Sequence, residues 1–406
     1  MQRANGWSRR GLVVVVVHSL LIQVIAFSIR PTLSYAALDA GIEPAALGLL
    51  SAAFALPGVL LAIPTGRLTD RLGERTIVVA GGVLMLASPV IALFGRGDLG
   101  AIVVATAVLG AGHLVSVVGD QAILANRTTA SARDGVFAGY AFSISLGQGI
   151  GGGLLAVNAI DAATPDIPLQ FALSTGLAAA TVLAAVFFRS SRRPAPSADA
   201  AAPVGVVALV RSHGVARAIL ASSLVVTAME ISIVYFPAIG YERGFGAATV
   251  SAMLVARAVA SMVSRFGLEW QVRVVGRRRL MVTSIAVSAV MLAALALPVG
   301  AGWLIAICAV FGFSAGVSQP LTLSWLSEIA PAGRRGMVMS LRIATNRVAQ
   351  AVVPVGLGAF GSVAGGASGV LLATAGLVGV SSWLSAAIGA SPPDEPPAGS
   401  AREDPL

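Results

Sequence analysis

The sequence predicts an all-α integral membrane protein with twelve transmembrane helices arranged as two six-helix bundles. The composition is the first reason, because 56% of the residues are hydrophobic and only 11% are charged, whereas a soluble domain has about 25% charged residues. The second reason is a series of twelve apolar segments, each near the roughly 20 residues that cross a bilayer core. The third is that the second six segments resemble the first six in sequence.

The twelve predicted helices follow one another with short polar connections. They cover residues 11–37, 45–66, 75–95, 99–123, 134–158, 167–188, 216–240, 247–266, 279–298, 302–327, 336–361 and 366–388. The first run continues past Ile29 with no small-residue cleavage site at a suitable distance. It therefore indicates a membrane helix and not a removable signal peptide.

The predicted domain organisation follows from composition. Residues 1–188 form the N-terminal bundle, and residues 216–388 form the C-terminal bundle. Residues 189–215 begin with a stretch rich in Arg, Pro, Ala and Ser, which indicates a cytoplasmic linker. Residues 389–406 are polar and rich in proline, which predicts a disordered cytoplasmic tail.

The arginines predict the orientation in the membrane. All 27 basic residues are arginine, and 21 of them fall on the side of the N-terminus, against two on the opposite side. This asymmetry predicts N-in and C-in topology in the inner (plasma) membrane. It also accounts for most of the net charge of +9 without a nucleic-acid partner.

The two halves share an internal repeat. AVLGAGHLVSVVGD, from Ala107, aligns with AVFGFSAGVSQPLT, from Ala309. SARDGVF at 131 aligns with AGRRGMV at 332, and DRLGERTI at 70 aligns with RVVGRRRL at 273. A near-constant offset over three helix pairs indicates a duplicated six-helix unit, which is an architecture of transporters.

Catalytic and metal chemistry find little support in the sequence. Cys308 is the single cysteine, and His18, His113 and His213 are far apart, so no metal-ligand spacing is present. A nucleotide-binding G-x-x-x-x-G-K-[ST] loop is absent from a chain without lysine. We therefore expect no enzyme activity and no cofactor.

The segment GRLTDRLGER, residues 66–75, resembles the signature loop between helices two and three of the major facilitator superfamily, roughly G-x-x-x-D-R-x-G-R-R/K. Glu74 departs from that signature, where arginine is usual. The matching residues are Gly66, Asp70, Arg71, Gly73 and Arg75. The resemblance extends to the helix number and the central linker, and implies a secondary transporter.

The resemblance implies that this loop is a conformational latch. Asp70 would dock on the N-terminus of helix eleven, near 333–336, where free N–H groups favour an anion. The family also places an acid at the inner end of helix four, and Asp120 fits that place, with Arg71 or Arg75 as its partner. The alternative is a solvated turn whose arginines only set the topology.

Helix five contains the run GQGIGGG, which resembles the glycine motif of antiporters in this superfamily but lacks its proline. Its glycines are Gly147, Gly149, Gly151, Gly152 and Gly153. One departure weakens the likeness to drug–proton antiporters. Many of them have an arginine in helix four, four residues before a glycine, and the corresponding residue before Gly110 is Thr106.

Ionisable groups in apolar helices predict functional sites, because each costs about 2.5–3.5 kcal/mol to insert at a helix centre. Glu230 in helix seven is the candidate for proton coupling. Arg257 in helix eight lies at about the same predicted depth, so a static Glu230–Arg257 pair is the alternative.

Further polar residues are candidates for the substrate cavity. Arg30 either contacts an anionic group or Asp39, or extends outward to the membrane surface. Helix eleven places polar residues on one face, which lines water or contacts another helix. These candidates are Arg30, His113, Arg257, Gln319, Arg342, Asn346, Arg347 and Gln350.

The sequence thus favours a monomeric, proton-coupled exporter of a small amphiphilic compound, with the substrate, protons and membrane lipid as partners. A proton-coupled importer of an organic anion is the first alternative, suggested by the buried arginines. A sensor or lipid-handling protein that moves no solute on the same fold is the second.

Overall fold

The computed structural model describes residues 9–95, 97–128, 133–159, 162–188, 215–329, 335–363 and 365–387. The first half contains helices α1 (Arg9–Asp39), η1 (Pro44–Leu47), α2 (Gly48–Leu72), α3 (Glu74–Phe94), α4 (Leu99–Arg127), α5 (Arg133–Leu154) and α6 (Ile167–Val186). The second half contains α8 (Val215–Arg243), α9 (Ala247–Arg265), α10 (Leu268–Val275), α11 (Arg277–Ala294), α12 (Ala301–Ile329), α13 (Arg335–Val363) and α14 (Gly366–Ala387).

Each predicted segment corresponds to one long helix, so the all-helical fold class is confirmed. Within the described residues, nine helices are long and apolar enough to span a membrane. The helices α5, α11 and α13 do not reach that hydropathy, and α13 contains Arg342 and Arg347 within its length. The predicted linker and tail lie almost entirely outside the described residues.

Short polar signals set several helix ends. Asp98 and Asp166 each accept a hydrogen bond from a backbone N–H three residues later, at the starts of α4 and α6. Such N-caps satisfy donors that the first turn leaves free. Gly73 joins α2 to α3 at φ +86°, and Gly276 joins α10 to α11 at φ +83°. Only glycine adopts this conformation readily, so both copies of the repeat preserve the same turn.

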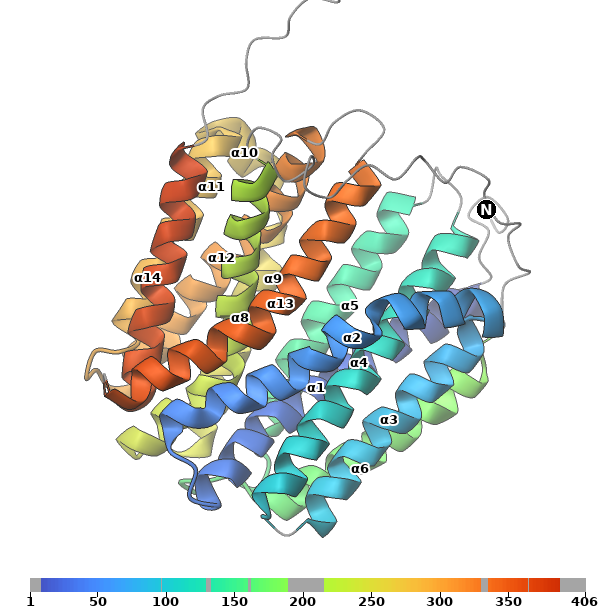
Figure 1. Cartoon of the computed structure of the whole chain (residues 1–406), viewed down its shortest axis with the longest axis horizontal. Coiled ribbons are helices and arrows are strands. Elements are labelled where there is room, and N and C mark those ends of the chain that lie inside the picture. Colours follow the sequence, from blue (N-terminus) through green and yellow to red (C-terminus); the bar gives the residue numbers. More distant parts are fainter. Residues whose placement is uncertain are drawn as a thin grey trace, which may run out of the picture.

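The packing pattern also occurs twice (Figure 1). In the first half the packed pairs include α1–α5, α1–α6, α2–α4, α3–α4 and α3–α6. The corresponding pairs of the second half are α8–α13, α8–α14, α9–α12, α11–α12 and α11–α14. This correspondence confirms the duplicated helical unit that the sequence predicts.

Two related glycines show how closely the repeats correspond. Gly110 in α4 lies against the backbone of Phe54 in α2, and a Cβ there would overlap it. Gly312 in α12 lies in the same way against the backbone of Arg257 in α9. Arg257 therefore occupies the position in the second half that Phe54 occupies in the first.

The two halves contact each other mainly toward the predicted outer face. The contacting pairs are α2–α13, α5–α9 and α1–α8, which a pseudo-two-fold axis interchanges. Gly48 is packed against the carbonyl of Pro354, and the Tyr235 hydroxyl donates to the Ala45 carbonyl oxygen at 2.7 Å. These contacts close the molecule at this face.

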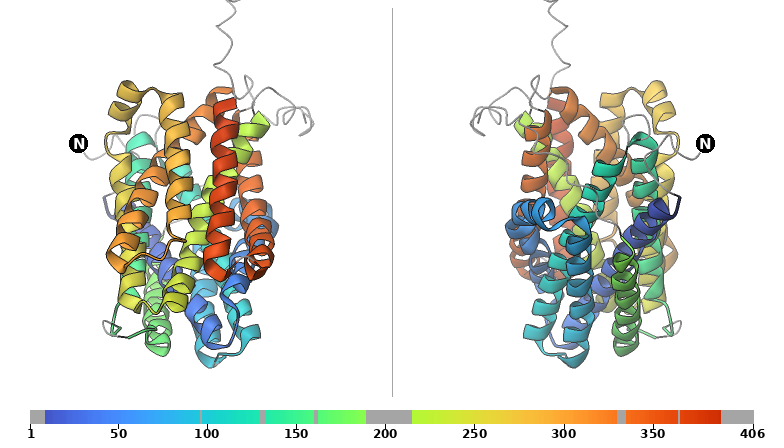
Figure 2. Two further views of the ribbon diagram at one scale, coloured as in Figure 1. Left: turned by 90° about the vertical axis from the view of Figure 1, so that its left-hand side faces the viewer. Right: turned by 90° about the vertical axis from the view of Figure 1, so that its right-hand side faces the viewer.

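The helices α2 and α13 diverge toward the opposite face. Figure 1 shows them close together at the end near η1 and separated toward the end where the N-terminus lies. The side views in Figure 2 show the helices of both halves running between the same two faces. With the predicted orientation, the contacts between α2 and α13 lie toward the outer face, and the two helices diverge toward the cytoplasmic face.

Candidate functional site

The centre of the candidate site is an ion pair between the two halves. Arg30 Nη1 in α1 donates to Glu230 Oε2 in α8 at 2.6 Å. Arg30 is buried, and 27% of the Glu230 side chain remains exposed. Of the predicted roles of Arg30, the structure agrees with contact to an anionic group, here Glu230, and not with contact to Asp39 or outward extension. Glu230 forms its ion pair with Arg30 and not with Arg257. The helices α1 and α8 pack directly against each other, which brings the two charges together.

Aromatic and amide groups surround this pair on the side of the first half. The Arg30 guanidinium carbon lies 4.1 Å from the ring centroid of Phe54. The Phe54 ring in turn lies 5.6 Å from that of His113, centroid to centroid. Gln23 Nε2 donates to His113 Nε2 at 3.1 Å. His113 is therefore part of the site, where it is oriented by a polar residue of α1.

Arg347 joins the same site from α13. Its Nη1 donates to Gln350 Oε1 one turn later at 3.2 Å, and its aliphatic part lies beside Gly58 of α2. Arg347 and His113 both lie within electrostatic reach of Glu230. Arg347 thus belongs to the Arg30–Glu230 cluster although it forms no salt bridge with Glu230.

Arg257 is the most enclosed cation of the site. Its side chain is 2% exposed, and its Nε and Nη2 atoms have no hydrogen-bond partner among the described residues. The guanidinium lies 5.7 Å from the Phe27 ring centroid and interacts electrostatically with Glu230 and Arg30. A cation held away from water without a paired anion is costly. The geometry therefore leaves Arg257 with unused capacity for an anion.

The polar face of α13 mostly contacts α8. Arg342 Nε donates to Ser222 Oγ at 2.9 Å, and Ser223 Oγ donates to Asn346 Oδ1 at 2.7 Å. Asn346 and Gln350 are buried. Of the two predicted roles of this face, the structure supports contact between helices. Gln319 in α12 is half-buried beside Met229 of α8.

The predicted latch is not engaged by any described residue. Asp70 is exposed and makes no hydrogen bond or ion pair with the described part of the chain. Residues 330–334, where its expected docking partner begins, lie outside the described residues. Gly66 has open space around its Cα, whereas Gly73 supplies the positive φ of the turn. Docking of Asp70 remains a prediction for another conformation.

Asp120 has a different partner from the one predicted. It is completely buried, and its Oδ1 lies 2.9 Å from His18 Nδ1. Arg75 is exposed, and Arg71 is exposed as well. The prediction of an arginine partner is therefore wrong, because α1 presents His18 to α4 inside the first bundle.

The glycines of α5 permit close approach on two sides. Gly147 and Gly151 lie against the backbone of α1, at Leu20 and Val24. Gly152 lies against Leu254 of α9, and its carbonyl accepts from Ser251 Oγ at 2.9 Å. Gly149 and Gly153 also face α9. The motif thus forms part of the contact between halves at the predicted outer face.

Four contributors to the site were not predicted from the sequence. Gln23 is a polar residue of an apolar helix, which is the same signal that singles out the buried arginines. Phe27, Phe54 and Met229 are apolar residues in apolar helices, and nothing in the sequence distinguishes them. Only the packing of their helices reveals these contacts.

Comparison with known proteins agrees with this architecture. The family model described as Major Facilitator Superfamily matches residues 15–266 and, separately, 218–405. The two matches overlap at residues 218–266 and together cover most of the chain. No curated protein sequence matches this chain.

Several solved structures share the fold at low sequence identity. The nucleoside transporter NupG, in a mutant form, is 13% identical with a TM-score of 0.77, over 93% of this chain and 99% of that one. A D-xylose–proton symporter is 16% identical with a TM-score of 0.74, over 93% and 97%. The human organic anion transporter MFSD10 (TETRAN) is 18% identical with a TM-score of 0.64, over 93% and 99%.

Proposed function

The chain belongs to the major facilitator superfamily, and we propose that it is a proton-coupled carrier of a small organic anion in the plasma membrane. It works as a monomer by alternating access, in which the two bundles rock about a central site. Protons and the substrate are its partners, and Glu230 is the residue that couples them. This proposal selects the anion alternative over export of an amphiphilic compound.

The observation that carries the proposal is the charge imbalance at the centre. Arg30, Arg257 and Arg347 supply three guanidinium groups, and Glu230 is the one carboxylate among the described residues that acts on all three. Arginine keeps its charge in proteins. A bound anion would satisfy the free donors of Arg257 and replace the negative charge of Glu230 when that carboxylate is protonated. The organic anion transporter among the structural neighbours shares the fold and is consistent with this choice.

Competition for Arg30 provides the coupling. An entering carboxylate or phosphate accepts the N–H groups of Arg30 that Glu230 now uses. Once its guanidinium partner is taken, a carboxylate in a low-dielectric site favours its neutral form. Glu230 therefore takes up a proton from water as the anion binds. The loaded site then contains one more proton and one more anion, so the two cross together.

A binding screen tests the choice of substrate class. Thermal unfolding of the purified protein is measured with paired compounds of one shape, such as benzoate, benzamide and benzylamine, over a panel of small organic acids. A ligand that binds the folded state raises the apparent melting temperature. We expect acids to raise it and their amides and amines to have no effect. Equal stabilisation by neutral or cationic members would overturn the proposal.

The coupling step is tested by Glu230→Gln in proteoliposomes loaded with the best acid from that screen. We expect uptake driven by a pH gradient to be lost while exchange of internal for external substrate continues, because an amide at this position carries no proton between states. The control is Glu242→Gln, which removes a carboxylate from the same helix but retains an acceptor for the Ala367 N–H. Gradient-driven uptake that survives Glu230→Gln would exclude Glu230 as the coupling residue.

A second candidate is export of an amphiphilic compound by proton antiport. The contacts of the α5 glycines with α1 and α9 favour it, since the resembling motif is associated with antiporters. The two candidates are distinguished by comparing the accumulation of a fluorescent amphiphile in cells with and without the gene. Lower accumulation with the gene favours export, and unchanged accumulation favours the anion carrier.

A further inference from the structure

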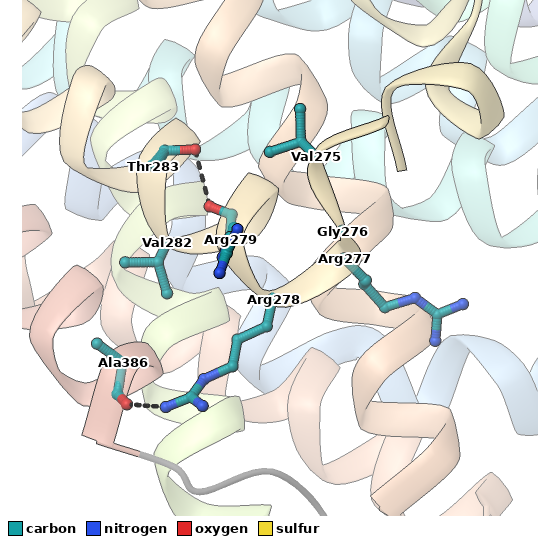
Figure 3. A pocket seen from close by; sticks show the side chains of 8 residues that line it. All are labelled: Val275, Gly276, Arg277, Arg278, Arg279, Val282, Thr283 and Ala386. Atoms are coloured by element: carbon teal, nitrogen blue, oxygen red, sulfur yellow. Dashed lines mark hydrogen bonds between the residues drawn. The ribbon is translucent and has the colours of Figure 1, made fainter. Parts of the chain in front are cut away.

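A basic cavity lies far from the central site, where the turn between α10 and α11 meets the end of α14. Its volume is about 780 Å³, and its lining includes Val275, Arg277, Arg278, Arg279, Val282 and Ala386. Figure 3 shows Arg278 reaching toward α14, where its Nη2 donates to the Ala386 carbonyl oxygen at 2.5 Å. This hydrogen bond therefore connects α11 and α14 beside the cavity.

The charge of this cavity is of one sign. Three consecutive arginines line it, no acidic residue does, and all three arginines are exposed. The guanidinium of Arg279 has no hydrogen-bond partner among the described residues, and Thr283 uses only its carbonyl oxygen. The wall of the cavity is mostly apolar, so an anion would be bound by the exposed guanidinium groups of Arg278 and Arg279 beside the cavity and not by its wall.

The repeat shows that this turn differs in charge from its counterpart. In the first half the turn around Gly73 contains Asp70 and Glu74 besides its arginines. At the corresponding positions around Gly276, arginines 273 and 277 replace both acids. The glycine geometry is kept in both copies. The second turn therefore carries arginines where the first carries two acids, and Arg278 and Arg279 follow them directly in sequence.

The neighbouring helix α10 places this cavity at a membrane boundary. Leu268 and Val272 pack against the core, while Trp270 and Val274 are each 64% exposed. Phe266, just before α10, is 65% exposed. A short helix with exposed apolar and aromatic side chains beside arginines is typical of segments lying at the headgroup level of a bilayer.

From this cavity we infer a binding site for the headgroup of an anionic phospholipid. The phosphate would accept from Arg278 and Arg279, with Arg277 adding to the positive field. The acyl chains would follow the apolar surface of Val275, Val282 and the exposed side of α10. Basic pockets between membrane helices bind acidic headgroups in this way. The site is independent of the central ion pair and of the proposed substrate.

The inference is tested by native mass spectrometry of the full-length protein from bilayers of phosphatidylglycerol and phosphatidylcholine. We expect the wild-type protein to retain phosphatidylglycerol in preference to phosphatidylcholine. The variant R277Q/R279Q keeps the Arg278–Ala386 hydrogen bond and should bind it roughly 25-fold more weakly, about fivefold per arginine. The matched control R67Q/R217Q removes two exposed arginines elsewhere on the same face and should bind as the wild type does.

Two further measurements distinguish lipid binding from capture of free phosphate and from a loss of folding. Inorganic phosphate at millimolar concentration should not displace phosphatidylglycerol, because it lacks the acyl chains. Each variant should unfold at a temperature close to that of the wild type in phosphatidylcholine alone. Equal retention of the two lipids by the wild type would overturn the inference. So would equal loss in both variants, or displacement by free phosphate.

Discussion

His18 and Asp120 form a completely buried pair inside the first bundle, with His18 Nδ1 at 2.9 Å from Asp120 Oδ1. The His18 ring also lies edge-on to Phe188, 5.2 Å between ring centroids. His18 Nε2 has no hydrogen-bond partner among the described residues. The pair joins α1 to α4 on the side of the bundle toward the N-terminus of the chain, so it stabilises the first bundle and not the contact between halves.

Removing one partner of this pair should destabilise the protein more than replacing both partners with leucine. Asp120→Leu leaves a buried imidazole N–H without an acceptor, and a buried donor left unsatisfied costs about 1–3 kcal/mol. The double variant H18L/D120L removes both polar groups and should recover most of that loss. Thermal unfolding in detergent measures both variants against the wild type. A double variant less stable than Asp120→Leu alone would contradict this account.

The closed outer face depends on the absence of a side chain at Gly48. Gly48→Ala places a Cβ against the Pro354 carbonyl, so we expect the outer ends of α2 and α13 to separate. Spin labels at exposed positions 43 and 360, with Cys308 replaced, should show weaker spin–spin coupling. Gly356→Ala is the control, because that position of α13 has open space. Unchanged coupling in Gly48→Ala would show that this contact does not hold the face closed.

Asp70 should matter in the conformation opposite to the one described here. Its side chain is exposed and contacts no described residue of the second half, so Asp70→Asn should leave substrate binding unchanged in the conformation described here. Transport should slow by roughly tenfold, corresponding to about 1.4 kcal/mol of lost latch energy. Glu269→Gln removes an exposed acid from the same face and should transport at the wild-type rate. Full transport by Asp70→Asn would reduce the loop to a charged turn.

The Arg257 side chain should lower the stability of the protein without substrate and raise its affinity for the anion. Arg257→Gln removes a buried cation whose donors are unsatisfied, so the apparent melting temperature without substrate should rise. Affinity for the best organic acid should fall by about tenfold, which is about 1.4 kcal/mol. The control Arg265→Gln, also in α9, loses a hydrogen bond to Ser145 and should not gain stability. A stabilised variant with unchanged anion affinity would assign Arg257 a purely structural role.

The sequence predicts the helices well because apolar length determines them. A rise of about 1.5 Å per residue also predicts a similar depth for Glu230 and Arg257, and the two side chains do interact electrostatically. Depth does not say which neighbour a side chain faces, and Glu230 in fact faces Arg30 across the axis between α1 and α8. His18 and Asp120 are separated by 102 residues, and no local pattern connects them. The helix α10 was expected only as part of a connecting segment.

The three guanidinium groups at the centre have an electrical consequence. In alternating access the transmembrane voltage falls mainly across whichever gate is closed, so fixed central charges pass from one electrical side to the other. Moving one elementary charge through 100 mV takes about 2.3 kcal/mol, and the empty site holds about two uncompensated positive charges. A bound monoanion and the proton that Glu230 takes up cancel, so the loaded site carries the same charge. Reorientation should therefore respond to voltage to the same extent with the site empty or loaded, and a complete transport cycle should carry no net charge across the membrane.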